Sequence, residues 1–172
     1  MAVRIGDTLP EGAQLVDGTA DDVGACVAVW LSAVEARDGH PAVAGTTERC
    51  LAKFERPRVA FVVARTAGSE LAGFGLVTAP GGGAATDPPG AAYLALLAVA
   101  PAAARHGIGG AILDALVAGS AAAGHDELVL HVLTDNTAAV GLYTSRGWRA
   151  YGDGHAHPLT GAASQTYVLS QR

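Results

Sequence analysis

The chain has 172 residues, half of them hydrophobic, which suits a single domain over residues 1–172 with a buried core. Its formal net charge is −5 and it contains no run of lysine or arginine, so a nucleic-acid-binding surface is not expected. No apolar run approaches the ~20 residues that span a bilayer, and residues 1–17 lack a signal-peptide pattern, so we expect a cytoplasmic protein without a membrane partner.

The first half of the chain predicts a short strand, two helices and a hairpin. Residues 14–16 are the short strand, and apolar side chains at helical spacing predict a helix over 22–35. A second, shorter helix is expected over 47–54. Residues 58–65 and 71–78 are rich in β-branched and aromatic side chains and are separated by a turn signal, which predicts an antiparallel hairpin.

The second half alternates strands and helices. The expected order is a strand over 93–100, a helix from Ile108 to near Gly124, a strand over 127–133, a helix over 136–146, and strands over 148–151 and 165–169. The segments 79–92 and 152–164 are rich in glycine and proline and are expected to be loops. A strand–helix–strand order requires a crossover connection, whereas the earlier hairpin is antiparallel. The sequence therefore predicts an α/β fold of the α+β type, with helices on both faces of a mixed sheet.

The loop after the apolar strand has the composition of a phosphate-binding loop. The strand stops at Pro101, and Gly107, Gly109 and Gly110 lead into the next helix. Unpaired N–H groups and the positive dipole end of a helix N-terminus attract anions, and glycines let a phosphate come close. A Walker A loop would need Lys and Ser/Thr after the glycines, and a dinucleotide loop a third glycine at Ile112, so neither fits. Close helix–strand packing is the alternative explanation for these glycines.

This loop resembles the pyrophosphate loop of the GNAT acetyltransferases. That family ends a strand in V-x-P and continues with R/Q-x-x-G-x-G/A, and residues 99–101 and 107–109 match in order and spacing. Ala104 stands where the family usually has Arg or Gln, with Arg105 one residue later. Because those family positions contribute mainly backbone N–H groups, an alanine at position 104 weakens the resemblance without removing it.

A second segment carries the resemblance further. Residues 136–148 are similar to the GNAT signature N-x-x-A-x-x-L-Y-x-x-x-G-F, with Trp148 in place of the final Phe. Asn136, Ala139 and Tyr143 are spaced by three and four residues, so we expect them on one face of a helix. A capping Asn, a packing Ala and a buried Tyr would explain each residue singly, but not the combination.

The resemblance implies a GNAT fold, with a mixed sheet of six to seven strands and about four helices. It also implies that acetyl-CoA lies between strands 93–99 and 127–133, with its pantetheine against the first strand and its pyrophosphate on residues 105–110. The cofactor-binding residues carried over in this way are Leu97, Ala98, Val99, Arg105, His106, Gly107, Ile108, Gly109, Gly110, Asn136, Ala139 and Tyr143.

The implied activity is N-acetylation of a primary amine on a small molecule or peptide, by direct attack on acetyl-CoA and without a metal. Tyr143 is the candidate general acid, because a phenol with a reference pKa near ~10 is protonated at neutral pH. The implied partners are acetyl-CoA, the amine acceptor and a second copy of the chain, since homodimers are common among similar proteins. An acyl donor larger than acetyl stays open, as does a catalytically silent acyl-CoA-binding domain that senses or scaffolds.

The general base is not evident from the sequence. Residues 93–104, where many relatives carry a Glu, contain no acidic side chain. His131 is chemically suitable, but a hydrogen-bonded core histidine explains it equally well. The acidic and histidine residues at 35–40 follow the first helix and are either acceptor-site residues or a solvated turn. A water relay from backbone carbonyls is the remaining alternative.

Two histidines and two cysteines raise the question of a metal. His155 and His157 lie in an expected glycine- and proline-rich loop without nearby cysteines, so an exposed turn is favoured over a metal site. Cys26 and Cys50 have no zinc-type spacing, and Cys26 is expected to be a small core residue.

Overall fold

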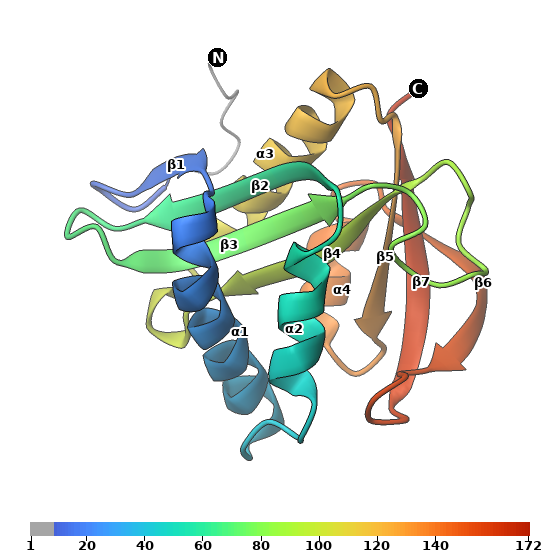
Figure 1. Ribbon diagram of the computed structural model, residues 1–172, viewed down its shortest axis with the longest axis horizontal. Helices are drawn as coiled ribbons and strands as arrows, with labels where there is room; N and C mark the ends of the chain where they lie inside the picture. The colour runs from blue at the N-terminus through green and yellow to red at the C-terminus, as the bar shows by residue number, and fades with distance from the viewer. Residues whose placement is uncertain (1–8) are drawn as a thin grey trace.

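The computed structural model describes residues 9–172, which form a seven-stranded mixed sheet with helices on both faces (Figure 1). The strands are β1 (Gln14–Asp17), β2 (Arg58–Arg65), β3 (Leu71–Thr78), β4 (Ala92–Val99), β5 (Glu127–Leu133), β6 (Arg149–Ala156) and β7 (Ala163–Ser170). The α-helices are α1 (Val23–Asp38), α2 (Thr46–Phe54), α3 (Ile108–Ala122) and α4 (Thr137–Thr144), with short 3₁₀ turns before α1 and after β4. The predicted fold class is confirmed.

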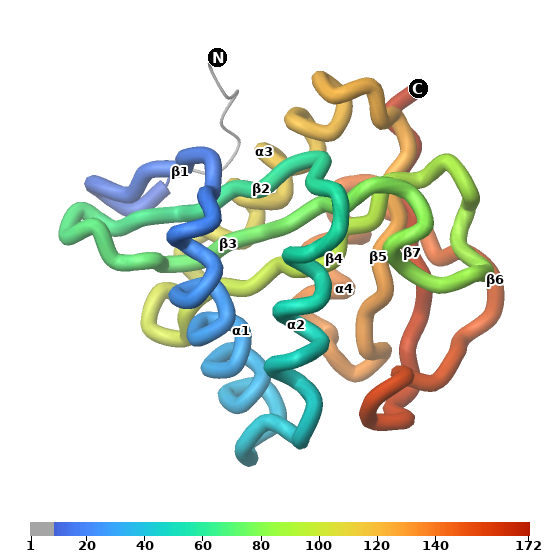
Figure 2. The backbone as a smooth tube through the Cα atoms, in the orientation of Figure 1, coloured from blue at the N-terminus to red at the C-terminus, as the bar shows by residue number. Residues whose placement is uncertain are grey.

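The strand order in the sheet is β1-β2-β3-β4-β5-β7-β6, and only the β4–β5 pair is parallel. The tube in Figure 2 follows the chain through the β2–β3–β4 meander and then through α3, which returns the chain to β5. This crossover is the predicted strand–helix–strand unit. It places β4 and β5 in the middle of the sheet, where both are mostly buried.

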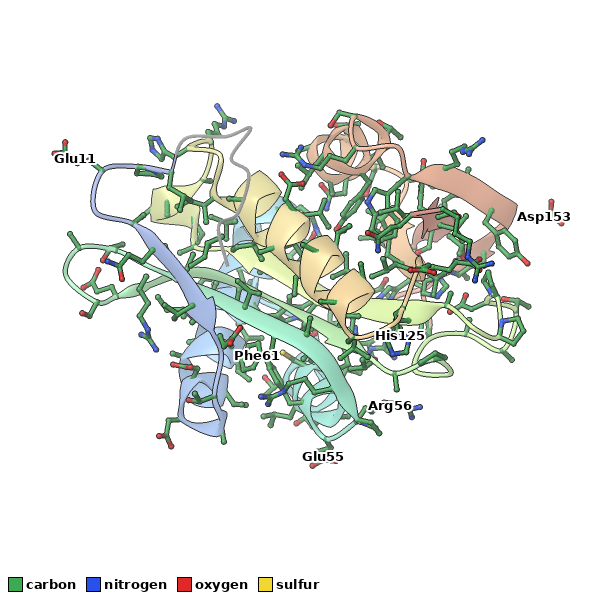
Figure 3. All side chains as sticks on the ribbon, turned by 90° about the horizontal axis from the view of Figure 1, so that it is seen from above. Glu11, Glu55, Arg56, Phe61, His125 and Asp153 are labelled. Atoms are coloured by element: carbon green, nitrogen blue, oxygen red, sulfur yellow. The ribbon has the colours of Figure 1, made fainter. Side chains whose placement is uncertain are left out.

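The sheet separates two hydrophobic cores. Seen from above, α3 lies on one side of the sheet and α1 and α2 on the other (Figure 3). On the α3 side, Ile112 and Leu116 pack against alternate residues of the central strands. On the α1–α2 side, Phe61 and Phe74 fill the space beneath the two helices. Successive residues of β5 therefore point to opposite cores, as strand geometry requires.

The strands β4 and β5 part soon after they begin. Parallel pairing is confined to Ala92 with Leu128 and Tyr93 with Val129. Beyond that point β4 pairs only with β3 and β5 only with β7. A bulge lies at the same place, because Leu94 pairs with Val77 and Leu96 with Leu76, which leaves Ala95 as the extra residue. One edge of β4 is consequently open to a ligand.

Several predicted boundaries were wrong, among them those of β6, α1 and α4. The segment 152–164 is not wholly a loop, because β6 runs to Ala156 and pairs with β7 beyond a bulge, and the Gln165 side-chain amide donates to the carbonyls of Tyr151 and Gly152. The first helix continues three residues further than predicted and stops at Gly39, which adopts φ 74°. The last helix is shorter than predicted and spans Thr137–Thr144.

Within residues 9–172, no helix has the length and the apolar character needed to cross a membrane.

Candidate functional site

A cleft of about 1380 Å³ opens where β4 and β5 part. Its walls come from β4, the loop before α3, the end of β5, α4, and the facing sides of α1 and α2. The lining includes every cofactor-binding residue predicted from the sequence except one: Leu97, Ala98, Val99, Arg105, Gly107, Ile108, Gly109, Gly110, Asn136, Ala139 and Tyr143. His106 belongs to the same loop but is exposed and does not line the cleft.

The N-terminus of α3 is open at the floor of this cleft. The first backbone bond of the helix runs from the N–H of Ala111 to the carbonyl of Gly107, so three earlier N–H groups have no helical partner. The N-cap, Gly107, has φ 78°, and Arg105 has φ 67°, a left-handed conformation that turns the loop back on itself. No side chain caps this end and no acidic residue occupies the first turn. These features match an anion-binding helix terminus.

Asn136 does not lie on a helical face with Ala139 and Tyr143 as predicted. It is the N-cap of α4, and its side-chain oxygen accepts a hydrogen bond from the Ala139 N–H at 3.3 Å. The capping explanation of this residue is therefore correct, although all three residues still line the cleft.

Tyr143 reaches the cleft from α4 on the α3 side of the sheet. It is 8% exposed and its ring packs against Trp148, with ring centroids 5.8 Å apart. Burial raises the pKa of Tyr143 well above its ordinary value, so the phenol is protonated throughout the neutral range. A neutral O–H donor is thus held in the wall of the cleft.

His131 lies in the opposite wall and both of its ring nitrogens are engaged. Nε2 is 3.0 Å from Oδ2 of Asp87, and Nδ1 is 3.0 Å from the hydroxyl of Thr166. The Asp87 and His131 side chains are 8% and 17% exposed. The hydrogen-bonded alternative therefore describes His131, which ties the loop before β4 to β5 and β7.

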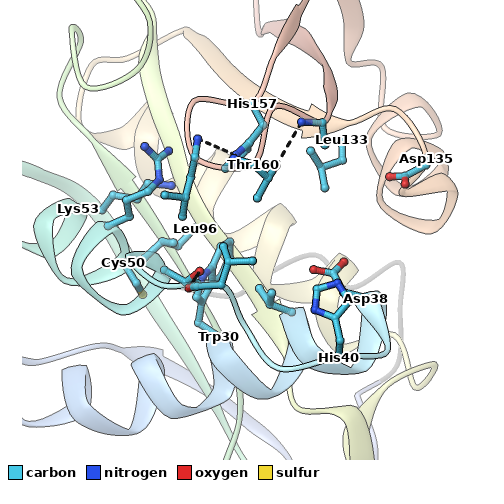
Figure 4. Close-up of a pocket in the computed structure, with 16 residues that line it drawn as sticks. Trp30, Asp38, His40, Cys50, Lys53, Leu96, Leu133, Asp135, His157 and Thr160 are labelled. Carbon is cyan, nitrogen blue, oxygen red and sulfur yellow. Dashed lines mark hydrogen bonds between the residues drawn. The ribbon is translucent and has the colours of Figure 1, made fainter.

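A smaller cavity of about 300 Å³ adjoins the cleft on the α1–α2 side (Figure 4). The close-up shows Lys53 and Trp30 on one side, His40 and Asp38 on another, and His157 and Thr160 above them. The residues that line both cavities mark the junction between them: Trp30, Val34, Arg49, Lys53, Leu96, Leu133 and His157. Two spaces thus meet at the point where β4 bulges.

Lys53 stands at this junction. Its Nζ donates a 3.0 Å hydrogen bond to the carbonyl of Ala95, the extra residue of the β4 bulge. The ammonium group also lies 5.7 Å from the ring centre of Trp30 and 5.9 Å from that of Tyr93. Loss of hydration, and then the guanidinium of Arg49, lower the pKa of Lys53 from 10.5 to about 8.

The acidic residues at the C-terminal end of α1 are occupied. Asp38 lines the smaller cavity but forms a 2.7 Å ion pair with Arg37, whose hydrogen bond lowers the pKa of the carboxyl. His40 also lines it, with Nδ1 2.9 Å from the carbonyl of Pro41. Glu35 is exposed, lies outside both linings and accepts the N–H of Ala42. This segment is thus part of the cavity wall through Asp38 and His40.

The two later histidines do not form the exposed turn that the sequence favoured. His155 belongs to β6, its ring lies 5.1 Å from that of His131, and it lines the large cleft. His157 lines both cavities, and its Nδ1 accepts the N–H groups of Leu159 and Thr160. In the part of the chain that is described, no three His, Cys, Asp or Glu residues come together as metal ligands.

Both cysteines are buried free thiols. Cys26 is fully buried, as predicted for a core residue, and burial raises its pKa to about 12. Cys50 is 1% exposed with a pKa of about 11 for the same reason. Neither is ionised near neutral pH, so neither is a reactive thiolate.

Sequence reasoning missed Arg49, Lys53, Asp87 and Thr166. Their neighbours in the site are distant in the chain, since Lys53 meets Ala95 and Asp87 meets His131 across more than forty residues. The only local signal was that Lys53 is the single lysine of the chain.

Comparisons with known proteins agree with this geometry. The sequence model of the acetyltransferase (GNAT) family matches residues 29–148. A mycothiol acetyltransferase from Clavibacter sepedonicus is 32% identical over 145 residues, which cover 82% of this chain and 44% of that protein. The chain thus spans less than half of this relative's length. The resemblance found in the two motifs is confirmed.

Solved structures share the fold. The ribosomal-protein-S18-alanine N-acetyltransferase from Escherichia coli has a TM-score of 0.70 at 20% identity and covers 92% of this chain and 93% of its own. An acetyltransferase of the same fold from Kribbella flavida has a TM-score of 0.70 at 22% identity, covering 94% and 99%. A putative acetyltransferase from Salmonella typhimurium, solved with its cofactor acetyl-CoA, has a TM-score of 0.69 at 17% identity, covering 94% and 95%.

Proposed function

Since the chain belongs to the acetyltransferase (GNAT) family, we propose that it transfers an acetyl group from acetyl-CoA to a primary amine of a small molecule or peptide. In this proposal Tyr143 is the general acid. Acetyl-CoA occupies the cleft between β4 and β5, and the amine approaches from the α1–α2 side through the smaller cavity.

The cleft is the observation that supports the proposal most strongly. It joins an open edge of β4, which offers backbone groups to the amides of pantetheine, to an uncapped helix N-terminus suited to a pyrophosphate. No acidic side chain of the first α3 turn opposes the negative charge there. The glycines at 107, 109 and 110 leave room for the phosphates beside the backbone.

The proposed reaction places the two proton transfers on opposite faces of the sheet. The amine nitrogen attacks the thioester carbon, a C–N bond forms and the C–S bond breaks. Tyr143 gives its proton to the departing sulfur, while the surplus proton of the amine leaves towards the α1–α2 side. Burial keeps Tyr143 protonated, so its hydroxyl is available as a donor to the thiolate, a stronger base than the thioester sulfur, when this develops beside it.

The acceptor does not follow from the relatives. One carries the name of mycothiol and another that of an alanine of ribosomal protein S18, and both differ from this chain at most positions. What supports an amine acceptor is the family and the cavity beside the thioester position, which is large enough for a small molecule or a peptide end.

Thermal unfolding with acetyl-CoA and with free CoA tests the cofactor, with NADH and ATP as controls. At a concentration of about 100 times its dissociation constant, a ligand of the folded state adds about 2.7 kcal/mol of stability. For a domain of this size each kcal/mol raises Tm by about 2–4 °C. Shifts with the CoA species alone support the proposal. No shift with acetyl-CoA or any longer acyl-CoA would refute it.

Replacing Tyr143 by Phe tests the chemical role. The change removes only the hydroxyl and keeps the ring against Trp148, so the fold and CoA binding should persist. We expect kcat with a panel of primary amines to fall by about 10²–10⁴-fold, the usual contribution of a general acid. Unchanged kcat would remove Tyr143 from the mechanism, and CoA binding without turnover of any amine by the unaltered protein would favour the silent acyl-CoA-binding domain.

A further inference from the structure

We infer that Lys53 is the general base that accepts the proton of the attacking amine. The inference rests on the proposed function and adds the group that the sequence could not identify. It is carried by the position of Lys53 at the junction of the two cavities, by its contact with the β4 bulge and by its lack of an acidic partner.

Lys53 lies next to the place proposed for the thioester. The thioester proposed for the cleft lies along β4 where this strand leaves β5, and Ala95 is the bulged residue at that place. Nζ of Lys53 is 3.0 Å from the Ala95 carbonyl and lines both the cleft and the smaller cavity. An amine entering through the smaller cavity therefore meets Lys53 before it meets the thioester. Tyr143 approaches from the other core, so acid and base flank the thioester from opposite faces.

The surroundings of Lys53 favour its neutral form. Among residues 9–172 no carboxylate pairs with it, and its neighbours are the rings of Trp30 and Tyr93, the thiol of Cys50, and the side chains of Arg49 and His157. Burial raises the pKa of Tyr93 to about 12, so Tyr93 carries no negative charge near neutral pH, and burial lowers the pKa of His157, so this ring is neutral there. With the pKa of Lys53 lowered to about 8, roughly one molecule in ten carries a neutral lysine at pH 7. Lysine is known to act as a base when burial shifts it in this way.

Three other titratable groups of the site are already committed, while Asp135 lines the smaller cavity at an exposed position and His155 lines the cleft from β6. Asp38 is paired with Arg37, and both nitrogens of His131 are hydrogen-bonded. Nδ1 of His157 accepts two backbone N–H groups. Lys53 donates only one of its N–H groups, to the Ala95 carbonyl. Because that contact uses an N–H group, the lone pair of the deprotonated Lys53 nitrogen is available to accept a proton.

The proposed step is balanced in protons and bonds. The amine nitrogen forms a bond to the thioester carbon and gives one proton to the lone pair of Lys53. The C–S bond breaks, and the sulfur takes the proton of Tyr143. Lys53 then releases its proton to water through the smaller cavity, and Tyr143 is reprotonated after CoA leaves.

The decisive comparison is between Lys53→Arg and Lys53→Met. Arginine keeps the positive charge and the donor to Ala95 but does not release a proton at any accessible pH. If Lys53 is the base, both variants lose about 10²–10⁴-fold in kcat with the amine panel while KM for acetyl-CoA stays nearly unchanged. The unaltered enzyme should show kcat/KM falling below about pH 8, and this limb should be absent in both variants. Arg149→Met, on the exposed side of β6, is the matched control for the loss of one charge.

Each alternative role gives a different result. Lys53→Arg with near-normal kcat would mean that Lys53 acts as a cation that binds substrate, and would overturn the inference. A rise in KM for acetyl-CoA with unchanged kcat would place Lys53 at the cofactor and would overturn it as well. If the unaltered protein does not bind CoA, this result instead counts against the proposed function itself.

A second measurement does not depend on finding the acceptor. Because Lys53 is the only lysine, trace labelling with acetic anhydride between pH 6 and 11, followed by mass spectrometry, reports its titration separately from the N-terminal amine. The inference is supported if the labelling of Lys53 has its midpoint near pH 8 and if saturating CoA suppresses this labelling. A midpoint near the ordinary 10.5, or no labelling at any pH, would overturn it.

Discussion

The lowered pKa of Lys53 has a consequence for stability that can be measured without any substrate. Replacing Lys53 by Met keeps an apolar chain of similar length beside Trp30 and Tyr93 but removes the ammonium group. We expect this variant to be more stable than the unaltered domain at pH 7. A residue that serves catalysis at the expense of folding is a known form of the stability–activity trade-off.

The magnitude follows from the two pKa values. A group at 10.5 in the unfolded chain and about 8 in the fold costs about 3 kcal/mol when charged, at 1.36 kcal/mol per unit. Lys53 is only partly buried, and the variant also loses the hydrogen bond to Ala95, worth about 1 kcal/mol. The expected net gain is therefore about 1–2 kcal/mol, or a rise in Tm of about 2–8 °C.

The stability difference between the two proteins should change with pH in one direction and over a defined pH range. The folded state disfavours the charged lysine, so this destabilisation is complete below pH 8, declines as pH rises, and is absent above 10.5. Urea unfolding of both proteins at pH 7, 9 and 10.5 should show the difference shrinking along the series. A destabilised Lys53→Met variant, or a difference that does not change with pH, would refute the reasoning about burial.

Two further predictions concern other parts of the chain. Gly109→Ala should raise KM for acetyl-CoA roughly tenfold, equivalent to about 1.4 kcal/mol, because the methyl group would stand where the phosphates are proposed to lie. Urea unfolding should show its stability unchanged or slightly raised, since the new Cβ would lie 3.4 Å from Val99, an ordinary contact, and alanine favours a helix over glycine; an unchanged KM would mean that Gly109 serves packing alone. Asp22→Asn should cost about 1–2 kcal/mol at pH 7, because the Asp22 carboxylate accepts the Thr19 N–H and pairs with Arg65. The backbone hydrogen bond lowers the pKa of Asp22, so this contribution is lost as pH falls through the folded value, and an equal cost at pH 2 would contradict it.

The sequence was sufficient for features that depend on neighbours along the chain. The strands at 58–65, 71–78 and 127–133 match the structure residue for residue, because their β-branched and apolar patterns act locally. The loop before α3 and the segment 136–148 revealed the family, since both motifs are contiguous stretches whose residues serve one ligand.

Local patterns failed where a distant partner decided the outcome. The second half of β6 contains Gly152 and Gly154 and was expected to be a loop, yet the strand extends to Ala156 because β7 supplies its hydrogen bonds. His131 was ambiguous in the sequence because its partners, Asp87 and Thr166, come from a loop and a strand far along the chain.

The amino-acid sequence by itself determined the class of fold, the family and eleven of the residues that line the cleft, because these follow from short-range periodicity and from contiguous motifs. Tertiary structure alone decided where β4 and β5 part, and which side chain stands at that point. Lys53 meets Ala95 only because α2 packs over a bulge in a strand more than forty residues away. Its altered acidity arises from that burial and from Arg49, and burial is a property of the folded chain that no local pattern encodes.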